Sequence, residues 1–482
     1  MNDKDIRSLS LTAQKKALES GELTSLAIVQ AYRAAYQADE AGEKPLKGYI
    51  EFFNDAEDKA READAARANG DKRPLLGLPF ASKDNISLKG KGCTCGSSIL
   101  KGYVAPYNAT VTDRLLAAGA IPLGRTNMDE FAMGSSTEYS AYGPSRNPVN
   151  RDLTPGGSSG GSAAVVAGLQ APVALGTETG GSVRLPASYC GVYGLKTTYG
   201  TLSRSGIVAF GSSLDQVGLL ARGPDDIALL LSVMAGKDSL DDTSADIDFS
   251  GLAGIVPDSI KGLKIALPKE FMGEKGLDPE VSAVFESACA WFTERGAVIE
   301  TVSIPVLEAA IGSYYVIALS EAASNLSRFD GIRYGLRKDP GEGYDELYVD
   351  TRSAGFGPEV KRRIVIGNYV LSTHFSGDTY KKAMSVRARI QRDVSEVLAT
   401  HDVILCPTSP TTAFPLGSKV DDPLAMYLTD LFTTFVNLAR IPSLSVPMGS
   451  TAHGLPVGVQ LCGPHFGEGR LLSIAKAWEA SK

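Results

Sequence analysis

Two glycine- and serine-rich segments carry the residue types that an acyl-transfer site needs. The first is PGGSSGGS at residues 155–162, and the second is GTETGGSVR at residues 176–184. Serine supplies a hydroxyl that can act as a nucleophile or pass on a proton, and glycine lets the backbone approach a ligand closely. Ser158 and Ser182 are 24 residues apart, with an apolar run between them. This pattern predicts an active site made of two loops that flank a buried segment.

The first segment also matches a different kind of serine hydrolase. Residues 156–160, GGSSG, fit the G-x-S-x-G pattern of the α/β-hydrolase nucleophile elbow. That elbow needs a strand directly before the serine, whereas residues 147–155 are polar and contain two prolines. It also needs a histidine base, and no compelling motif surrounds any of the histidines, which are His374, His401, His453 and His465. The elbow is therefore the weaker interpretation.

A phosphate-binding loop is a further alternative for the same glycines. Residues 156–162 contain two glycines at the right spacing followed by serine, but the lysine of that motif is missing. Without this cation the loop has no partner for the terminal phosphates, so the sequence argues against nucleotide binding here.

Lys83 offers a base that could activate a serine. It ends the apolar segment GLPFASK, residues 77–83, and burial would lower its pKa from about 10.4 towards neutrality. A neutral lysine can accept the proton of a serine hydroxyl. A single lysine at a strand end is usually a surface charge, but the two glycine–serine segments favour the catalytic interpretation.

The motifs around these residues resemble the amidase signature family. The resemblance rests on PGGSSGGSAA, on GTETGGSVRLPASYCGVYGLKTTYG, on the lysine segment GLPFASKDN and on the 24-residue serine spacing. It implies a Ser–cis-Ser–Lys triad. Ser182 is then the nucleophile that forms an acyl ester, Ser158 is the relay with a cis peptide bond, and Lys83 is the general base and acid.

The same resemblance implies roles for neighbouring positions. Backbone N–H groups of Thr179, Gly180, Gly181 and Ser182 would form the oxyanion hole, where one donor is typically worth about 2.7–4 kcal/mol. Ser159 and Arg184 match supporting positions. For these two residues a structural hydrogen-bonding role is nearly as good an interpretation as a catalytic one.

Segments outside the triad resemble the glutaminase subunits of tRNA-dependent amidotransferases. They are residues 127–138, 356–364, 422–430 and 454–460, and the likeness spans residues 5–480. It implies that glutamine is hydrolysed and that the ammonia converts ATP-activated glutamyl-tRNA(Gln) to glutaminyl-tRNA(Gln) in a partner subunit. Two further subunits, of B and C types, are then the partners. ATP and Mg²⁺ are expected in a partner subunit, no cofactor or metal is expected in this chain, and tRNA is contacted only through the complex.

The charged groups of free glutamine determine which residue types a glutamine-binding pocket needs. It carries a carboxylate and an ammonium, so a selective pocket needs a cation and an anion side by side, and arginine binds carboxylates in a bidentate manner. The resemblance assigns Arg362 to the carboxylate, Asp430 to the ammonium and Tyr314 to the pocket lining. Arg363 competes with Arg362, and the sequence leaves the choice between them open.

Two other functions compete with this one. A free-standing amidase acting on small or aliphatic amides would have no use for a buried pair of ion-binding residues. A binding or scaffold protein without catalysis would not need all three triad residues.

One segment, residues 372–378, departs from the family pattern, which has a Tyr-rich stretch at this place. This departure puts the local helix packing and a partner surface in doubt.

The elements that must position these residues are those of an α/β protein. Strand-like runs at 78–82, 120–124 and 171–175 alternate with helical patterns, for example at 111–118 and 162–169, as in an α/β domain. We therefore expect the amidase signature fold, with a mixed central β-sheet flanked by helices. Residues 1–70 are predicted as an N-terminal helical cover. Residues 71–482 are predicted as the amidase domain, with a helical insertion around 305–400 that is broken by the polar segment 338–357.

Composition limits the alternatives further. The chain has 482 residues, 43% hydrophobic and 21% charged, which is typical of a globular protein. A net charge of −7 argues against direct binding of nucleic acid. The six cysteines have no framework spacing, the N-terminus has no signal pattern, and no apolar run reaches the length of a membrane span. A cytoplasmic location without membrane contact is the simplest expectation.

Overall fold

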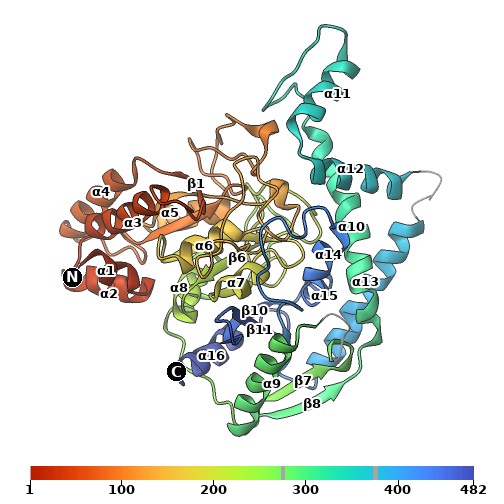
Figure 1. The fold of residues 1–482 in the computed structure, drawn as a ribbon. Coiled ribbons are helices and arrows are strands. Elements are labelled where there is room, and N and C mark those ends of the chain that lie inside the picture. Colours follow the sequence, from red (N-terminus) through yellow and green to blue (C-terminus); the bar gives the residue numbers. More distant parts are fainter. Residues whose placement is uncertain (1, 273–276, 373–377) are drawn as a thin grey trace.

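One mixed β-sheet runs through the part of the protein that the structure describes (Figure 1). The computed structural model describes residues 2–272, 277–372 and 378–482. Within them, 11 strands lie in the order β1-β3-β2-β4-β6-β5-β10-β11-β9-β7-β8. The strands are β1 (Tyr49–Phe52), β2 (Pro79–Lys83), β3 (Ile121–Thr126), β4 (Val173–Glu178), β5 (Tyr193–Lys196), β6 (Gln216–Ala221), β7 (Lys264–Pro268), β8 (Val298–Val302), β9 (Val403–Pro407), β10 (Ser443–Ser450) and β11 (Pro456–Cys462).

Two groups of parallel strands flank an antiparallel middle section of this sheet. β2 pairs in parallel with β3 and β4, and β7 pairs in parallel with β8 and β9. The strands between these groups, from β4 through β6, β5, β10 and β11 to β9, pair antiparallel. Every residue of β2, β4, β6 and β9 is buried, because helices or loops cover both faces. The predicted mixed sheet flanked by helices is confirmed.

Helices cover the sheet on both faces and extend beyond it (Figure 1). They are α1 (Asp3–Ser8), α2 (Leu11–Ser20), α3 (Ser25–Glu40), α4 (Ala56–Ala68), α5 (Thr110–Ala117), α6 (Gly160–Ala167), α7 (Arg184–Cys190), α8 (Pro224–Met234), α9 (Pro279–Glu294), α10 (Ala310–Asn325), α11 (Tyr344–Gly355), α12 (Pro358–Leu371), α13 (Asp378–Leu398), α14 (Pro423–Tyr427), α15 (Thr434–Ala439) and α16 (Glu468–Glu479). The short 3₁₀ turn η7 (Leu428–Asp430) follows α14.

Two buried helices hold the glycine–serine segments in the core. α6 begins inside the first segment, and α7 begins at the end of the second. α6 packs on β4 and α7, while α7 packs on β5, β10 and β11. Because β4 leads directly into the second segment, the sheet and these two helices together fix where both segments lie.

The N-terminal region departs from the helical prediction at one place. α1 to α4 lie together at one end of the molecule (Figure 1), but β1 lies inside the range predicted as helical and pairs with β3. The rings of Tyr49 and Phe52 in β1 pack against Tyr36 of α3. This aromatic packing buries the two end residues of a strand of only four residues, which is too short for a clear sequence pattern.

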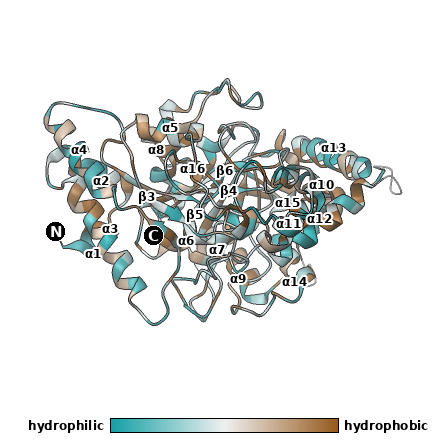
Figure 2. Ribbon diagram, turned by 90° about the horizontal axis from the view of Figure 1, so that it is seen from above, coloured by the Kyte–Doolittle hydropathy of each residue, from teal (hydrophilic) through white to brown (hydrophobic). Residues whose placement is uncertain are grey.

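Helices α10 to α13 form a lobe at the other end of the molecule (Figure 1). The prediction of a break at 338–357 is wrong in part, because α11 occupies Tyr344–Gly355. In the described part of the chain one helical stretch, Pro305–Arg328, is long and apolar enough to be tested as a membrane span, and more than half of it is buried in the protein. That burial is expected of a core helix, and α10 packs against α12, α13 and α15. Figure 2 shows α13 at the outer edge of this lobe, and its buried residues Ala383, Arg387, Ile390 and Val394 recur every three to four positions, as in an amphipathic helix.

Candidate active site

Lys83 makes hydrogen bonds within the first glycine–serine segment. Its Nζ lies 2.8 Å from Oγ of Ser158 and 2.8 Å from Oγ of Ser159. A third contact, 3.1 Å long, goes to the carbonyl oxygen of Thr177 in β4. Lys83 is the last residue of the buried strand β2 and is completely shielded from solvent. The structure therefore brings together two residues of the predicted triad that are 75 positions apart in sequence.

Burial controls the protonation of this lysine. Loss of hydration lowers the pKa of Lys83 to about 7, although the carboxylates of Asp129 and Asp215 act in the opposite direction. A large share of Lys83 is then uncharged at neutral pH. An uncharged amine beside a serine hydroxyl can accept its proton, which is the chemistry that the sequence predicts for this position.

Asp129 holds the backbone around Ser158. The peptide bond between Gly157 and Ser158 is cis, and the N–H of Asp129 donates to the Ser158 carbonyl at 3.3 Å. The Asp129 carboxylate accepts the N–H groups of Thr137 and Tyr139. A methyl group on Gly157 would lie 2.1 Å from Oδ2 of Asp129, so only glycine fits there.

Ser182 lies in a turn, residues 178–184, which we call the Ser182 turn. The N–H of Ser159 donates to the Ser182 carbonyl at 3.0 Å, so the two glycine–serine segments are in contact. Ser182 is 8% exposed and Ser158 is fully buried, which leaves Ser182 as the serine that a ligand can reach. The Glu178 carboxylate accepts the N–H groups of Val183 and Arg184 and forms a buried ion pair with Arg184.

Outside contacts fix the predicted oxyanion positions in this turn. The Thr179 hydroxyl donates to Oδ1 of Asp215 at 2.6 Å. The carbonyl of Gly180 accepts the Thr433 hydroxyl at 2.6 Å. Gly181 has a φ of +144°, a backbone conformation that other residues rarely adopt. Because these contacts use the side chain of Thr179 and the carbonyl of Gly180, they orient the turn without occupying its N–H groups.

Asp430 borders the Ser182 turn. Its Oδ2 accepts the Ser135 hydroxyl at 2.7 Å and lies 3.4 Å from the Tyr315 hydroxyl. Its Oδ1 would lie 3.0 Å from a methyl group on Gly181 and accepts no hydrogen bond from the described residues. Burial raises the pKa of Asp430 to about 7, against the lowering effect of the Ser135 hydrogen bond and of Arg363. A buried carboxylate with a free oxygen thus faces the Ser182 turn.

Tyr314 covers the same turn from α10. A methyl group on Gly180 would lie 2.3 Å from Cζ of Tyr314, so the phenol is in direct contact with the turn. Tyr314 is 4% exposed, and its ring packs edge-on against Tyr315 at 5.0 Å between centroids. The structure therefore places Tyr314 against Gly180, one of the predicted oxyanion positions.

The structure places the two neighbouring arginines in different surroundings. Arg362, assigned to the substrate carboxylate, has a side chain that is 41% exposed, whereas that of Arg363 is 3% exposed. The Arg363 guanidinium lies over the rings of Tyr427 at 5.1 Å, Tyr315 at 5.7 Å and Phe210 at 6.0 Å. Adjacent residues on a helix point about 100° apart, so the two side chains face different ways, and Arg363 is the one buried beside Tyr315 and Tyr427.

Glu359 fixes the orientation of Arg363. It lies one turn earlier on α12, and its Oε1 accepts from Nε of Arg363 at 2.7 Å and from the Tyr427 hydroxyl at 2.9 Å. Burial alone would lower the pKa of Arg363, but Glu359 and the two tyrosines raise it. The Nη atoms of Arg363 make no hydrogen bond with any residue that the structure describes, so they remain available to a ligand.

Several residues of this site carry no assignment from the sequence. They are Asp129, Ser135, Phe210, Asp215, Tyr315, Glu359, Tyr427 and Thr433. The Ser135–Asp430 contact joins residues 295 positions apart, and no local pattern indicates such a pair. For Arg363 a signal does exist, because Val360, Ile364 and Gly367 are buried on the same helical face.

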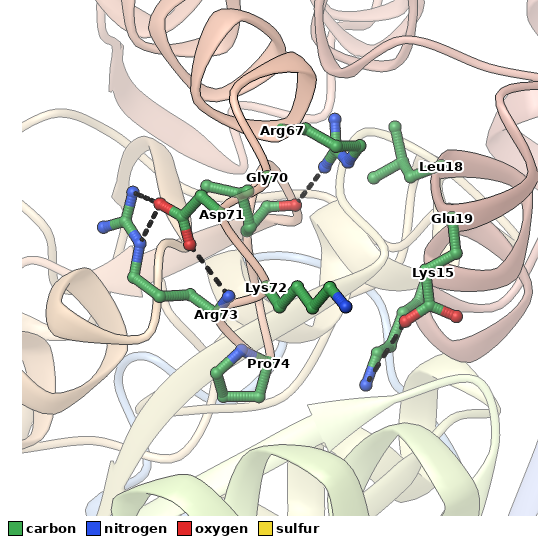
Figure 3. A pocket seen from close by; sticks show the side chains of 10 residues that line it. Lys15, Leu18, Glu19, Arg67, Gly70, Asp71, Lys72, Arg73 and Pro74 are labelled. Atoms are coloured by element: carbon green, nitrogen blue, oxygen red, sulfur yellow. Dashed lines mark hydrogen bonds and ion pairs between the residues drawn. The ribbon is translucent and has the colours of Figure 1, made fainter.

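A separate surface cavity of about 350 Å³ lies between α2, α4 and the segment before β2 (Figure 3). Leu18, Pro74 and Leu76 form its apolar part. Arg73 pairs with Asp71 and Lys15 with Glu19, whereas Lys72 carries no such contact in this view (Figure 3). None of the predicted site residues lines this cavity, so it is distinct from the candidate active site.

The family model for Amidase matches residues 28–472 of the chain. The chain belongs to the amidase family. Among curated relatives of this amidase, the A-type subunit of glutamyl-tRNA(Gln) amidotransferase from Treponema denticola is 64% identical over 480 residues, covering 98% of this chain and 99% of the relative. The corresponding protein of Koribacter versatilis is 47% identical over 477 residues, with 98% of each chain covered.

Solved structures of amidase-family enzymes agree with the fold. The A-type subunit of glutamyl-tRNA(Gln) amidotransferase from Thermotoga maritima has a TM-score of 0.81 at 38% identity, covering 99% of this chain and 95% of the other. The peptide amidase of Stenotrophomonas maltophilia has a TM-score of 0.83 at 30% identity, covering 98% and 97%. This amidase-family chain is therefore an enzyme of the amidase or amidotransferase class.

Two further expectations concern the segment 372–378 and metal binding. Of the segment 372–378, which departs from the family pattern, residues 373–377 lie outside the described residues. Across 2–272, 277–372 and 378–482, the structure contains no group of three or more His, Cys, Asp or Glu side chains that could hold a metal ion.

Proposed function

We propose that this amidase-family chain is the glutamine-hydrolysing subunit of a glutamyl-tRNA(Gln) amidotransferase. One observation carries the proposal. The lysine–serine pair of Lys83 and Ser158 lies beside a turn that is bordered by a buried carboxylate, Asp430. Arg363 provides the matching buried cation next to Tyr315, the tyrosine that reaches Asp430. Such a pair suits a substrate that carries both charges, as free glutamine does, and it does not suit an aliphatic amide.

The proposed reaction begins with Ser182 as nucleophile. Ser182 Oγ attacks the side-chain amide carbon of glutamine while its proton passes through the Ser158 hydroxyl to uncharged Lys83. N–H groups of Thr179, Gly180 and Gly181 stabilise the oxyanion of the tetrahedral intermediate. Collapse of the intermediate breaks the C–N bond, and the proton returns from Lys83 through Ser158 to the leaving nitrogen, which departs as ammonia.

Water completes the cycle. The γ-glutamyl ester on Ser182 is attacked by a water molecule whose proton is taken up along the same route. Ester cleavage then releases glutamate and returns the proton to Ser182. Ser159 shares the Lys83 contact with Ser158 at the same 2.8 Å distance, and Arg184 stiffens the turn through Glu178, so both act as supporting residues.

The two charged groups of the substrate have partners of complementary chemistry. The Nη atoms of Arg363 offer a planar pair of donors to the α-carboxylate. The free Oδ1 of Asp430 accepts from the α-ammonium. Tyr314 lines the pocket between them and the Ser182 turn. This assignment replaces Arg362 with Arg363 and keeps the roles that the sequence predicts for Asp430 and Tyr314.

Partners follow from the same proposal. The ammonia is used by a B-type subunit, with a C-type subunit completing the complex, and ATP and Mg²⁺ serve the partner that activates glutamyl-tRNA(Gln). The tRNA contacts this chain only through the complex, in agreement with its net charge of −7. We further propose that the complex works in the cytoplasm.

The test uses the chain assembled with its co-purified partners. Wild type should release ammonia from glutamine and support ATP-dependent amidation of glutamyl-tRNA(Gln). Ser182→Ala should abolish glutamine-dependent amidation and leave amidation with added ammonium chloride intact. Ser158→Ala should form little acyl-enzyme although Ser182 is present. Efficient hydrolysis of aliphatic amides together with no activity on glutamine would instead identify a free-standing amidase.

A further inference from the structure

Asp215 is a buried carboxylate with no part in the proton path described above. Its two oxygens bind different segments of the chain. Oδ1 accepts the Thr179 hydroxyl at 2.6 Å, and Oδ2 accepts the N–H groups of Phe210 at 2.8 Å and Gly211 at 3.0 Å. One carboxylate thus joins the Ser182 turn to the segment 210–215.

That segment also reaches the substrate pocket. The ring of Phe210 lies under the Arg363 guanidinium, at 6.0 Å from its centroid. Nδ2 of Asn325 in α10 donates to the Phe210 carbonyl at 3.1 Å, which holds the backbone that carries this ring. A continuous set of contacts therefore leads from Thr179 through Asp215 and Phe210 to Arg363.

The charge on Asp215 decides how the Thr179 hydroxyl points. An ionised carboxylate can only accept hydrogen bonds, so the hydroxyl proton must face it. Burial raises the pKa of Asp215 to about 6, so the group is mostly ionised at neutral pH. Three charged groups surround Asp215: Glu321 of α10, Lys83 of β2 and Arg204. Arg204 and Asp215 also line a surface cavity of about 170 Å³.

We propose that Asp215 is a positioning residue that couples the Ser182 turn to the carboxylate-binding side of the pocket. This role rests on the proposed function. Through Thr179, Asp215 holds the turn that carries Ser182 and its N–H donors. Through Phe210, it holds the aromatic surface on which Arg363 lies. Substrate engaged by Arg363 then meets a turn that is already oriented for attack.

The decisive variant is Asp215→Asn. Asparagine keeps the shape and can still accept the two backbone N–H groups, but it presents an NH₂ donor to Thr179, so the hydroxyl must turn around. Two rate measurements on the assembled enzyme are needed: steady-state hydrolysis of glutamine, and the labelling of Ser182 by a fluorophosphonate, which forms a serine–phosphorus bond and releases fluoride. The labelling rate does not depend on which amide is the natural substrate.

We expect labelling to slow by about 10-fold in Asp215→Asn, since direct loss of an oxyanion donor costs about 100- to 1,000-fold and an indirect effect is smaller. Glutamine turnover should show both a lower kcat and a higher KM, because both ends of the contact chain are affected. Thr179→Val, which lacks the hydroxyl, should slow labelling to a similar extent. The double variant should be no slower than the slower single variant, because the two residues act through one contact.

Matched controls separate positioning from stability. Thr179→Ser keeps the hydroxyl that Asp215 accepts, so it should label faster than Thr179→Val. Glu321→Gln perturbs the same segment from outside, where Glu321 accepts the N–H of Ser213 at 2.9 Å, and should leave the labelling rate within about twofold. Thermal melts of every variant record the stability change.

The outcomes are distinct. A lower melting temperature with unchanged labelling of the folded enzyme, or independent effects of the two substitutions, would overturn the proposal. If Asp215→Asn does not fold, equal labelling of Thr179→Val and Thr179→Ser would overturn it, and slow labelling of the valine variant alone would support it. If wild type labels normally at Ser182 but does not hydrolyse glutamine, the proposed function is refuted. The labelling rates of the variants would still test the role of Asp215.

Discussion

Nε of Arg363 lies 2.7 Å from Oε1 of Glu359, one helical turn away on α12. Both side chains are 3% exposed, and the Tyr427 hydroxyl completes the contact at 2.9 Å. Because Glu359 occupies only Nε, the guanidinium is held in one orientation while its Nη atoms stay free of partners among the described residues. A rigid, buried and charged fork of this kind suits recognition of a carboxylate.

Substitution of the two neighbouring arginines should separate their roles. A hydrogen bond to a charged group contributes about 1.5–3 kcal/mol, so Arg363→Lys should raise the KM for glutamine about 10- to 100-fold. Arg362→Lys is the matched control and should change KM by less than about threefold, since its side chain is 41% exposed. Steady-state kinetics of ammonia release measures both, and a larger effect at Arg362 would restore that residue as the carboxylate ligand.

Asp430 should make glutamine binding depend on pH. Its pKa is raised to about 7 by burial, and only the ionised carboxylate attracts an ammonium. The KM for glutamine should therefore rise as the pH falls below about 7, and Asp430→Asn should weaken binding at all pH values and remove this dependence. Measurement of KM between pH 6 and pH 8 in both forms checks the prediction, and a pH-dependent KM in the asparagine variant would contradict it.

The residues closest to the chemistry can be predicted from the sequence because their signals are local. Ser158 and Ser182 lie in glycine-rich segments whose backbone needs are visible in the residue types, and Lys83 ends an apolar run. The strand that an α/β-hydrolase elbow would need before Ser158 is not found among the described residues, since 147–155 contain only an isolated bridge at Leu153. The roles assigned to these residues remain predictions until the variants are measured.

The pocket can be predicted only in part because it is assembled from distant segments. Ser135 and Asp430 meet across 295 positions, and Thr179 and Asp215 across 36. The burial of Arg363 rather than Arg362 has a different cause: the helical phase of α12, set by its buried apolar residues, turns Arg363 inward. Strand β1 could not be predicted from the local sequence, because its packing on Tyr36 and its pairing with β3 stabilise it.

Lys83 should limit the rate at low pH. Because the proposed base must be uncharged and its pKa is lowered to about 7, kcat/KM for glutamine should fall as the pH drops below about 7 and level off above it. Lys83→Arg should be inactive across the range, because arginine stays protonated in proteins. Rates of acyl-enzyme formation between pH 5.5 and pH 9 measure this directly, and appreciable activity of Lys83→Arg would rule out Lys83 as the base.

Burial of Lys83 should lower the free energy of unfolding at neutral and acidic pH. Its pKa is lowered in the folded protein, so the folded state binds fewer protons than the unfolded state between about pH 7 and pH 10.5, and stability rises with pH in this window. The penalty is full below about pH 7 and disappears near pH 10.5. Lys83→Met should therefore raise the melting temperature most at pH 6 and least at pH 10, whereas a constant gain would mean that Lys83 is not desolvated.

Gly180 should tolerate no side chain, because a methyl group there would lie 2.3 Å from Cζ of Tyr314. Gly180→Ala must displace either the tyrosine or the Ser182 turn, and we expect kcat for glutamine to fall by about 100-fold or more, as for loss of an oxyanion donor. Gly312→Ala is the matched control, since Gly312 lies in α10 with no atom near the added methyl group. Alanine there should stabilise the helix by about 0.5–1 kcal/mol and leave activity unchanged. Kinetics with thermal melts of both variants tests the pair, and a fully active Gly180→Ala would mean that Tyr314 does not pack on the turn.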